Sequence, residues 1–214
     1  MLVGKAASAV LFGMGRGPVM IYSGQEIGEA GGDLAGFSQD VKRTTVFDYW
    51  SMKEFVKWVN GGKYDGALLG DAQKRLRAWY GKLLSVLAQP GFTKGEFYGL
   101  NFFNRENEYF GRLEGEEVSG HWLYSFLRHD AASWQSFLMI ANFHPTQDMA
   151  EVRVRIPRDA WDFLGRSGDE KWAFTDRLEG SWHTVADRDL LEGDGVLFGE
   201  LEALNVAVLE ISKW

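Results

Sequence analysis

Cysteine is absent from the chain, and proline and histidine are scarce, with 4 of each among 214 residues. Without cysteine the protein has no disulfide framework, no thiolate metal site and no cysteine nucleophile. Basic residues are also in the minority, because 23 Lys and Arg stand against 30 Asp and Glu, for a formal net charge of −7. A dedicated nucleic-acid-binding protein normally shows a basic face, so no nucleic-acid partner is expected.

Long apolar runs are missing as well. No stretch is long enough to span a bilayer, so no membrane partner is expected. The N-terminal residues have the small side chains of a secretory signal, but Lys5 follows the first apolar residues and glycines interrupt the apolar run. A signal peptide places its charge first and keeps its apolar segment unbroken, so we expect no export through this segment. Because a lack of cysteine suits both the cytoplasm and exported bacterial proteins, the localisation stays unknown.

The chain does contain the material for a folded core, with 45% hydrophobic and 14% aromatic residues. Up to about residue 100, the apolar residues recur mainly at helical spacing. This spacing predicts helices over residues 2–14, 51–60 and 71–89. The short apolar run Pro18–Ser23 is typical of a buried strand.

Capping signals mark two of these helices. Ser51 is a plausible N-cap because Glu54 follows it three residues later. Asp71 can cap the start of the third helix, and Pro90 with Gly91 ends it.

Beyond residue 100 the apolar residues alternate, and turns recur at intervals typical of an antiparallel sandwich. Residues 129–133 are the expected hairpin loop between the first two strands. The predicted fold class is therefore α+β, with a helical domain at residues 1–100 and an all-β domain at residues 101–214. The predicted strands cover residues 122–129, 134–143, 150–157, 171–178, 195–201 and 205–211.

The most informative motif is "GPVMIYSGQEIGE", residues 17–29. It closely resembles the last barrel strand of the α-amylase superfamily, glycoside hydrolase family 13, which typically reads Gly-x-Pro-x-Ile-Tyr-Tyr-Gly-Asp/Glu-Glu-x-Gly. Gln25 departs from this pattern, since an acidic residue is usual there. Allowing for one missing residue after the first glycine, the matching residues are Gly17, Pro18, Ile21, Tyr22, Gly24, Glu26 and Gly28.

Two further stretches resemble the same family. "KRTTVFDYW", residues 42–50, is similar to the loop that follows the strand in oligo-glucosidase-like members, with Arg43, Thr44 and Trp50 as the matching residues. "LMIANFHP", residues 138–145, resembles a strand of the family's C-terminal domain that ends in Val-x-Asn-Phe/Leu. The resemblance therefore runs through most of the chain.

The resemblance implies that residues 1–100 are the C-terminal remnant of a (β/α)8 barrel, with its last strand and helices. It also implies that residues 101–214 are the Greek-key β-sandwich that follows this barrel. The family cleaves α-glucosidic bonds of starch-type glucans with retention, using two carboxylates. Because those motifs are not in this chain, no catalytic residue is assigned, and the chain alone is expected to be inactive.

The resemblance implies that this chain retains only a wall of the substrate site, which binds α-glucan or malto-oligosaccharide in the full enzyme. An Arg offers a rigid fork of donors to hydroxyls, and an aromatic face suits the C–H side of a sugar ring. Ordinary structural roles are the alternative: backbone contacts at a strand end, an ion pair or loop packing. The candidate substrate-binding residues are Gln25, Glu26, Arg43, Tyr49 and Trp50, with Phe47 as a further aromatic.

The all-β half offers two weaker signals. Five tryptophans suggest either a sugar-binding platform or ordinary core packing; they are Trp122, Trp134, Trp161, Trp172 and Trp182. The acidic run at residues 187–195 lacks the oxygen spacing of a calcium loop and is typical of a solvated turn. No metal and no other cofactor is predicted.

Three functions are compatible with these observations. The leading one is the C-terminal part of an α-amylase-type glycoside hydrolase. A second is a non-catalytic module that binds α-glucan. The third is a structural piece that associates with itself through the exposed strand Pro18–Ser23 and the helices, because an open strand edge invites pairing.

Overall fold

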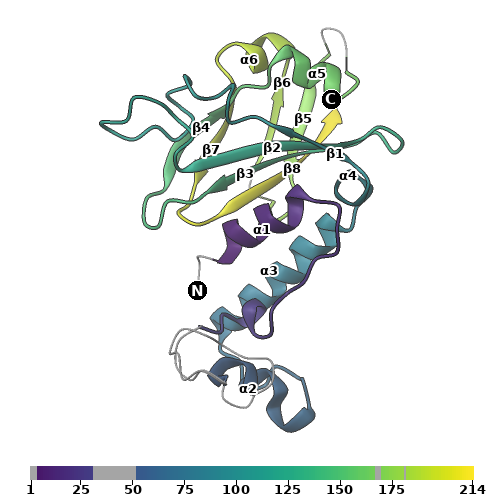
Figure 1. Cartoon of the computed structure of the whole chain (residues 1–214), viewed down its shortest axis with the longest axis vertical. Coiled ribbons are helices and arrows are strands. Elements are labelled where there is room, and N and C mark those ends of the chain that lie inside the picture. Colours follow the sequence, from purple (N-terminus) through teal and green to yellow (C-terminus); the bar gives the residue numbers. More distant parts are fainter. Residues whose placement is uncertain (1–3, 31–51, 167–169, 181) are drawn as a thin grey trace. The chain divides into compact units, whose positions relative to one another are not determined.

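The computed structural model describes residues 4–30, 52–166, 170–180 and 182–214 (Figure 1). These residues form an α+β protein, as the sequence predicts, with helices and antiparallel strands in two sheets and no closed barrel. The chain divides into two compact units, one of Pro18–Leu84 and one of Leu2–Gly17 with Ser85–Trp214. The N-terminal helix and the residues just before 100 therefore belong with the sheets.

The unit Pro18–Leu84 is built from helices. It contains α2 (Lys53–Val59) with a 3-10 turn directly after it, and most of α3 (Asp71–Leu87). The apolar stripe predicted for α3 is largely buried, and Leu83 at its centre is fully buried. The sequence prediction of this helix is confirmed.

The run Pro18–Ser23 is the main departure from the predicted elements. It is not a strand, and no strand of the described residues pairs with it. Val19 is 39% exposed and Met20 is 79% exposed. A strand is stable when a neighbour takes up its backbone hydrogen bonds and its side chains are covered, and an apolar run alone supplies neither. The predicted strand is thus wrong for this chain, and the barrel remnant stays a prediction.

A distant carboxylate caps α2. Oε2 of Glu29 accepts the backbone N–H groups of Glu54 at 2.7 Å and of Phe55 at 2.8 Å, in the first turn of the helix. These are donors that a helix start leaves without partners, and a negative charge suits the positive end of the helix. Ser51, the predicted cap, lies outside the described residues.

The start of α3 has one half of a capping box, although not around the predicted residue. The carbonyl of Gly70 accepts the N–H of Lys74, and the N–H of Gly70 donates to Oε1 of Gln73 at 3.1 Å. Gly70 is therefore the cap, with Gln73 at the third helical position. Asp71, predicted as the cap, is the first residue of the helix instead.

The second unit holds the strands, which in the described residues number eight in two antiparallel sheets (Figure 1). The six-stranded sheet has the order β1-β2-β3-β8-β5-β6, and the two-stranded sheet pairs β4 with β7. The strands are β1 (Glu96–Gly99), β2 (Leu123–Asp130), β3 (Gln135–Asn142), β4 (Met149–Val154), β5 (Trp172–Asp176), β6 (His183–Ala186), β7 (Val196–Leu201) and β8 (Val206–Lys213).

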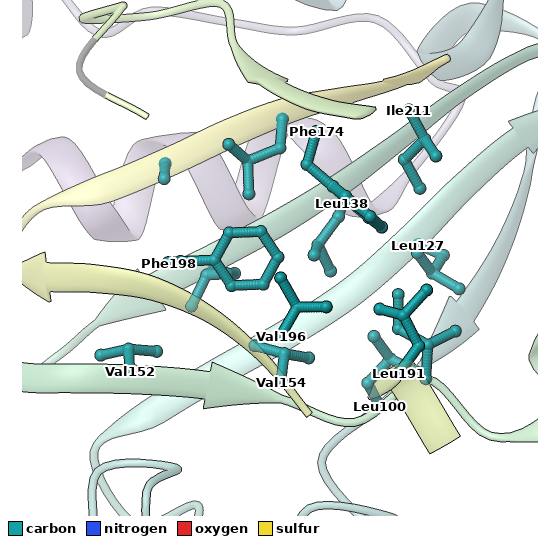
Figure 2. Close-up of a cluster of buried hydrophobic side chains, with 14 of the residues drawn as sticks. Leu100, Leu127, Leu138, Val152, Val154, Phe174, Leu191, Val196, Phe198 and Ile211 are labelled. Atoms are coloured by element: carbon teal, nitrogen blue, oxygen red, sulfur yellow. The ribbon is translucent and has the colours of Figure 1, made fainter. Parts of the chain in front are cut away.

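Both sheets contribute to one apolar core, drawn in Figure 2. Leu127 and Leu138 of the large sheet belong to the same cluster as Val154, Val196 and Phe198 of the small sheet. Successive side chains of a strand point to opposite faces, so these alternate residues mark the inner face of each sheet. The two sheets thus pack around a shared core, as in a sandwich, while the Greek-key connectivity stays a prediction.

The central strands are buried on both faces, because α1 (Gly4–Met14) covers the other face of the large sheet (Figure 1). A Cβ added at Gly13 would come within 2.8 Å of the Met139 side chain on β3, so the absence of a side chain lets the helix approach. This explains why seven of the eight residues of β3 are buried.

All six predicted strands are present, with boundaries that differ by a few residues, and the hairpin loop after residue 130 is confirmed. The short strands β1 and β6 were not predicted. Nor were the helices that interrupt the strands, α5 (Arg158–Phe163) and α6 (Arg188–Glu192). The run predicted as a solvated turn thus contains α6.

Candidate functional site

The motif that follows Pro18–Ser23 folds into a tight turn. Residues Gln25–Ile27 form one 3-10 turn between Gly24 and Gly28, whose φ angles are 85° and 75°. Positive φ is cheap for glycine and strained for other residues, so both glycines of the motif serve the backbone. A Cβ at Gly24 would also meet the Glu29 side chain at 2.7 Å. The turn fixes the directions of Gln25 and Glu26.

Gln25 has a structural role. Its Oε1 accepts the backbone N–H of Tyr22 at 3.1 Å, and its Nε2 donates to the hydroxyl of Tyr80 on α3 at 3.2 Å. The amide therefore closes the turn and ties it to the helix. The amide oxygen of the glutamine serves as the acceptor of the first contact, and its amide nitrogen is the donor of the second.

Glu26 lies in the wall of a pocket of about 410 Å³. Its Oε2 is buried and has no hydrogen-bond partner among the described residues. A buried carboxylate oxygen without a donor is costly, so a ligand hydroxyl that reached this atom would remove that cost. The other lining residues are Ile21, Tyr22, Ser23, Phe55, Arg77, Tyr80, Gly81 and Leu84.

The pocket wall combines aromatic rings with a cation. Tyr22, Phe55 and Tyr80 provide the rings. The guanidinium carbon of Arg77 lies 3.9 Å from the centre of the Trp58 ring, a cation–π contact that orients the guanidinium. Such a set can stack on a sugar ring and hydrogen-bond to its hydroxyls.

A polar network that the sequence analysis missed supports this wall. Nε2 of Gln73 donates to the carbonyl of Ile27 at 3.2 Å and to Oε2 of Glu54 at 2.6 Å. Lys57 also donates to that Glu54 oxygen, and this hydrogen bond is the main cause that lowers the pKa of Glu54. These contacts join residues 46 and 19 positions apart, so no local pattern in the sequence signals them.

The remaining candidates lie outside the described residues. Arg43, Phe47, Tyr49 and Trp50 all fall in residues 31–51, and their predicted contact with a sugar stays a prediction. Of the five candidate site residues, the structure therefore places only Gln25 and Glu26.

The pocket lacks the pair of carboxylates that glycoside hydrolysis uses. Glu26 is the one acidic residue in its wall within the described part of the chain. A retaining mechanism needs a second carboxyl group about 5 Å away, as nucleophile or as general acid. The described wall therefore provides one carboxylate beside its aromatic rings and guanidinium.

The tryptophans of the sheet unit have different environments. Trp161 is in the core, while Trp122, Trp172 and Trp182 are partly buried against it. Trp134 is 63% exposed. Core packing thus accounts for most of them, and Trp134 is the exception.

The described residues show neither a metal site nor a membrane-spanning helix. No cluster of three or more His, Asp or Glu side chains is arranged to hold a metal ion. No described helix has the length and apolar character that crossing a bilayer requires.

No family model and no curated protein matches the sequence. Among solved structures, the chain is similar to the galactosidase domain of alpha-galactosidase-sucrose kinase, AgaSK, with a TM-score of 0.41 and 12% sequence identity. The match covers 84% of this chain and 21% of that one, so this chain corresponds to about a fifth of its length. The similarity to this carbohydrate-related enzyme domain is distant.

Proposed function

We propose that the chain is the C-terminal portion of an α-amylase-type glycoside hydrolase that acts on α-glucosidic bonds of starch-type glucans. On its own it binds such glucans through the Glu26 pocket and does not cleave them. The sequence support is the resemblance of residues 17–29 to the last barrel strand of that family. Phe47, Arg43, Tyr49 and Trp50 extend the proposed sugar contacts beyond the pocket.

The observation that carries this proposal is the unpartnered Oε2 of Glu26 in a wall with Tyr22, Tyr80 and Arg77. A sugar hydroxyl would satisfy the carboxylate oxygen, and the rings would cover the apolar face of the pyranose. The lack of a second acidic residue in the described wall accounts for binding without hydrolysis.

The test is a calorimetric titration of the chain with maltoheptaose, with the β-linked cellohexaose as linkage control. We expect saturable binding of maltoheptaose and no release of reducing sugar. Glu26→Gln should weaken binding about tenfold, because a hydrogen bond to a charged group is worth roughly 1.5–3 kcal/mol. Glu106→Gln is the matched control, because that side chain is 75% exposed and lies outside the pocket.

The outcomes separate the candidate functions. Binding that Glu26→Gln leaves unchanged would move the glucan site elsewhere and favour a non-catalytic binding module. No binding at millimolar maltoheptaose would leave a structural role. Hydrolysis by the purified chain would contradict the proposal that it is inactive alone.

A further inference from the structure

A second pocket, of about 500 Å³, lies in the unit that contains the two sheets. It shares no lining residue with the Glu26 pocket. Two indoles stand in its wall beside charged and amide side chains, namely Trp134, Trp172, Arg166, Gln135, Glu210 and Lys213.

Arg166 is the unusual member of this wall, because it is only 7% exposed. Its Nη2 donates to Oγ of Ser136 at 3.0 Å and to the carbonyl of Ile211 at 3.1 Å. Its Nε and Nη1 are buried and have no hydrogen-bond partner among the described residues. A guanidinium has five N–H donors, so this residue of the pocket wall keeps unused donors. Buried donors without acceptors are costly, which favours a ligand that supplies acceptors.

Among the described residues, no carboxylate makes a hydrogen bond or an ion pair with Arg166, and the nearby charge of Glu170 only partly offsets the cost of burying its cation. The acids around it are engaged elsewhere: Glu210 accepts from Nε of Arg177 at 2.7 Å, and Glu170 pairs with Lys213. Burial lowers the pKa of Arg166 to about 10, so the guanidinium is still a cation at neutral pH. Burying a cation costs free energy, and an anionic ligand beside the guanidinium would lower this cost further.

The aromatic residues give the pocket a flat surface. The guanidinium carbon of Arg166 lies 3.9 Å from the centre of the Trp172 ring. Trp134 is mostly exposed and has a φ of 57°, a conformation that costs a bulky residue backbone energy. The positive φ of Trp134 closes the hairpin between β2 and β3 and leaves its indole on the surface of the pocket wall.

Trp134 is held in place from both sides. In the hairpin before it, Oδ2 of Asp130 accepts from the N–H of Ser133 at 3.1 Å and from its hydroxyl at 2.5 Å. The indole ring lies against Gly165, where an added Cβ would come within 3.3 Å of it. The ring is therefore positioned next to Arg166 before any ligand arrives.

We propose that this pocket binds an anionic saccharide. The carboxylate or phosphate of the ligand accepts hydrogen bonds from Arg166, and its pyranose ring stacks on Trp134. Gln135, Glu210 and Lys213 offer donors and acceptors to its hydroxyls. This site is independent of the function proposed above, which concerns neutral α-glucans and the Glu26 pocket.

The test compares four ligands by calorimetric titration: methyl glucuronide, glucose 6-phosphate, methyl glucoside and inorganic phosphate. We expect one or both of the charged sugars to bind at least about tenfold more tightly than the other two ligands. The tighter of the charged sugars identifies a carboxylate or a phosphate as the natural acid group. Equal binding of methyl glucoside would overturn the role of charge. Equal binding of inorganic phosphate would overturn the role of the ring, and no binding of either charged sugar would overturn the proposal.

Two variants locate the site. Trp134→Ala should weaken binding of the charged sugar about tenfold without unfolding the chain, because the side chain is mostly exposed. Phe102→Ala is the matched control, since Phe102 is 80% exposed and does not line the pocket. Unchanged binding in Trp134→Ala would overturn the proposal.

Arg166→Lys keeps the charge but loses the planar stack on Trp172, and Arg166→Gln loses both. We expect binding to fall in that order where the variants fold, and Trp134→Ala carries the test where they do not. Trp134→Ala should leave maltoheptaose binding at the Glu26 pocket unchanged, so failure here and failure of the proposed function can be told apart.

Discussion

At the scale of single residues, one buried asparagine side chain links two segments of the sheet unit. Asn142, from the stretch "LMIANFHP", is fully buried at the end of β3. Its Nδ2 donates to the carbonyls of Gln147 and Leu201 at 3.0 Å each, and to that of Glu202 at 3.1 Å. The asparagine thus joins the large sheet to the end of β7. Its role is structural, because it satisfies carbonyls that would otherwise be buried without donors.

His129 makes the stability of the fold sensitive to pH. The side chain is 5% exposed and its Nδ1 lies 2.9 Å from Oγ of Ser136, the oxygen that Arg166 also contacts. Burial, and then the charge of Arg166, lower the pKa of His129. The unfolded chain, with a histidine pKa of ~6.5, therefore binds the proton more readily than the folded chain. The contribution of the neutral His129 side chain to the stability of the fold is therefore complete above a pH of ~6.5. It is lost as the pH falls below that value.

We expect His129→Asn to reduce this acid loss of stability. The measurement is the free energy of unfolding in urea, one pH unit above and one below ~6.5. His121→Asn is the control, because that side chain is 70% exposed, and it should keep the loss seen in the unmodified chain. A His129 variant that loses as much stability on acidification as the unmodified chain would show that other groups are responsible.

Single-residue roles were only partly predictable from the sequence. Glu26 was singled out from the motif, and the structure places it in a pocket. Arg166 was not identified from the sequence, because no motif surrounds it and its hydrogen-bond partner Ser136 lies 30 positions away in the chain. Gln25 hydrogen-bonds to Tyr80, a contact that depends on how the turn meets α3, and its predicted contact with a sugar stays a prediction. Contacts between distant segments follow from packing, which local patterns do not encode.

At the scale of elements, one buried arginine joins two helices to the large sheet. Arg128 of β2 is 2% exposed. Its Nη1 donates to the carbonyl of Met14, the last residue of α1, at 2.6 Å. Its Nη2 donates at 2.7 Å to the carbonyls of Phe92 in α4 (Pro90–Thr93) and of Gly95 just after it. These are carbonyls that helix ends leave without partners, and a cation suits the negative end of a helix.

We expect Arg128→Met to lower the free energy of unfolding by about 3 kcal/mol or more, since it removes donors from several buried carbonyls at once. Arg16→Met is the matched control, because Arg16 is exposed and pairs with the exposed Glu96; its loss should cost less than about 1 kcal/mol. Urea unfolding measures both. Equal effects of the two substitutions would mean that the carbonyls find other donors or water.

Elements were predictable where the local pattern was long. The alternation in residues 122–129 and 134–143 predicted β2 and β3, and the stripe in residues 71–89 predicted α3. The four-residue strands β1 and β6 are too short for a period to show. The run Pro18–Ser23 has the composition of a strand but no partner strand in the described residues. Composition alone therefore predicted a strand, whereas a strand forms only where another strand pairs with it.

At the scale of the whole molecule, the run Pro18–Ser23 is the surface through which we expect copies of the chain to associate. It carries exposed apolar side chains and has no strand beside it in the described residues. A surface segment with no strand beside it can pair with another chain. A second copy of the same protein can supply an identical segment in antiparallel pairing around a two-fold axis, the commonest symmetry of homodimers. We therefore expect the purified chain to associate with itself in a concentration-dependent way.

Met20→Glu tests this expectation, because Met20 is 79% exposed and the substitution places like charges together in a symmetric pair. It should weaken self-association at least about tenfold in sedimentation velocity without changing the free energy of unfolding of the monomer. Leu68→Glu is the matched control: Leu68 is 57% exposed in the same unit but lies outside the run, so its loss should leave association unchanged. A chain that stays monomeric at every concentration, or an equal effect of both substitutions, would exclude this run as the contact between copies.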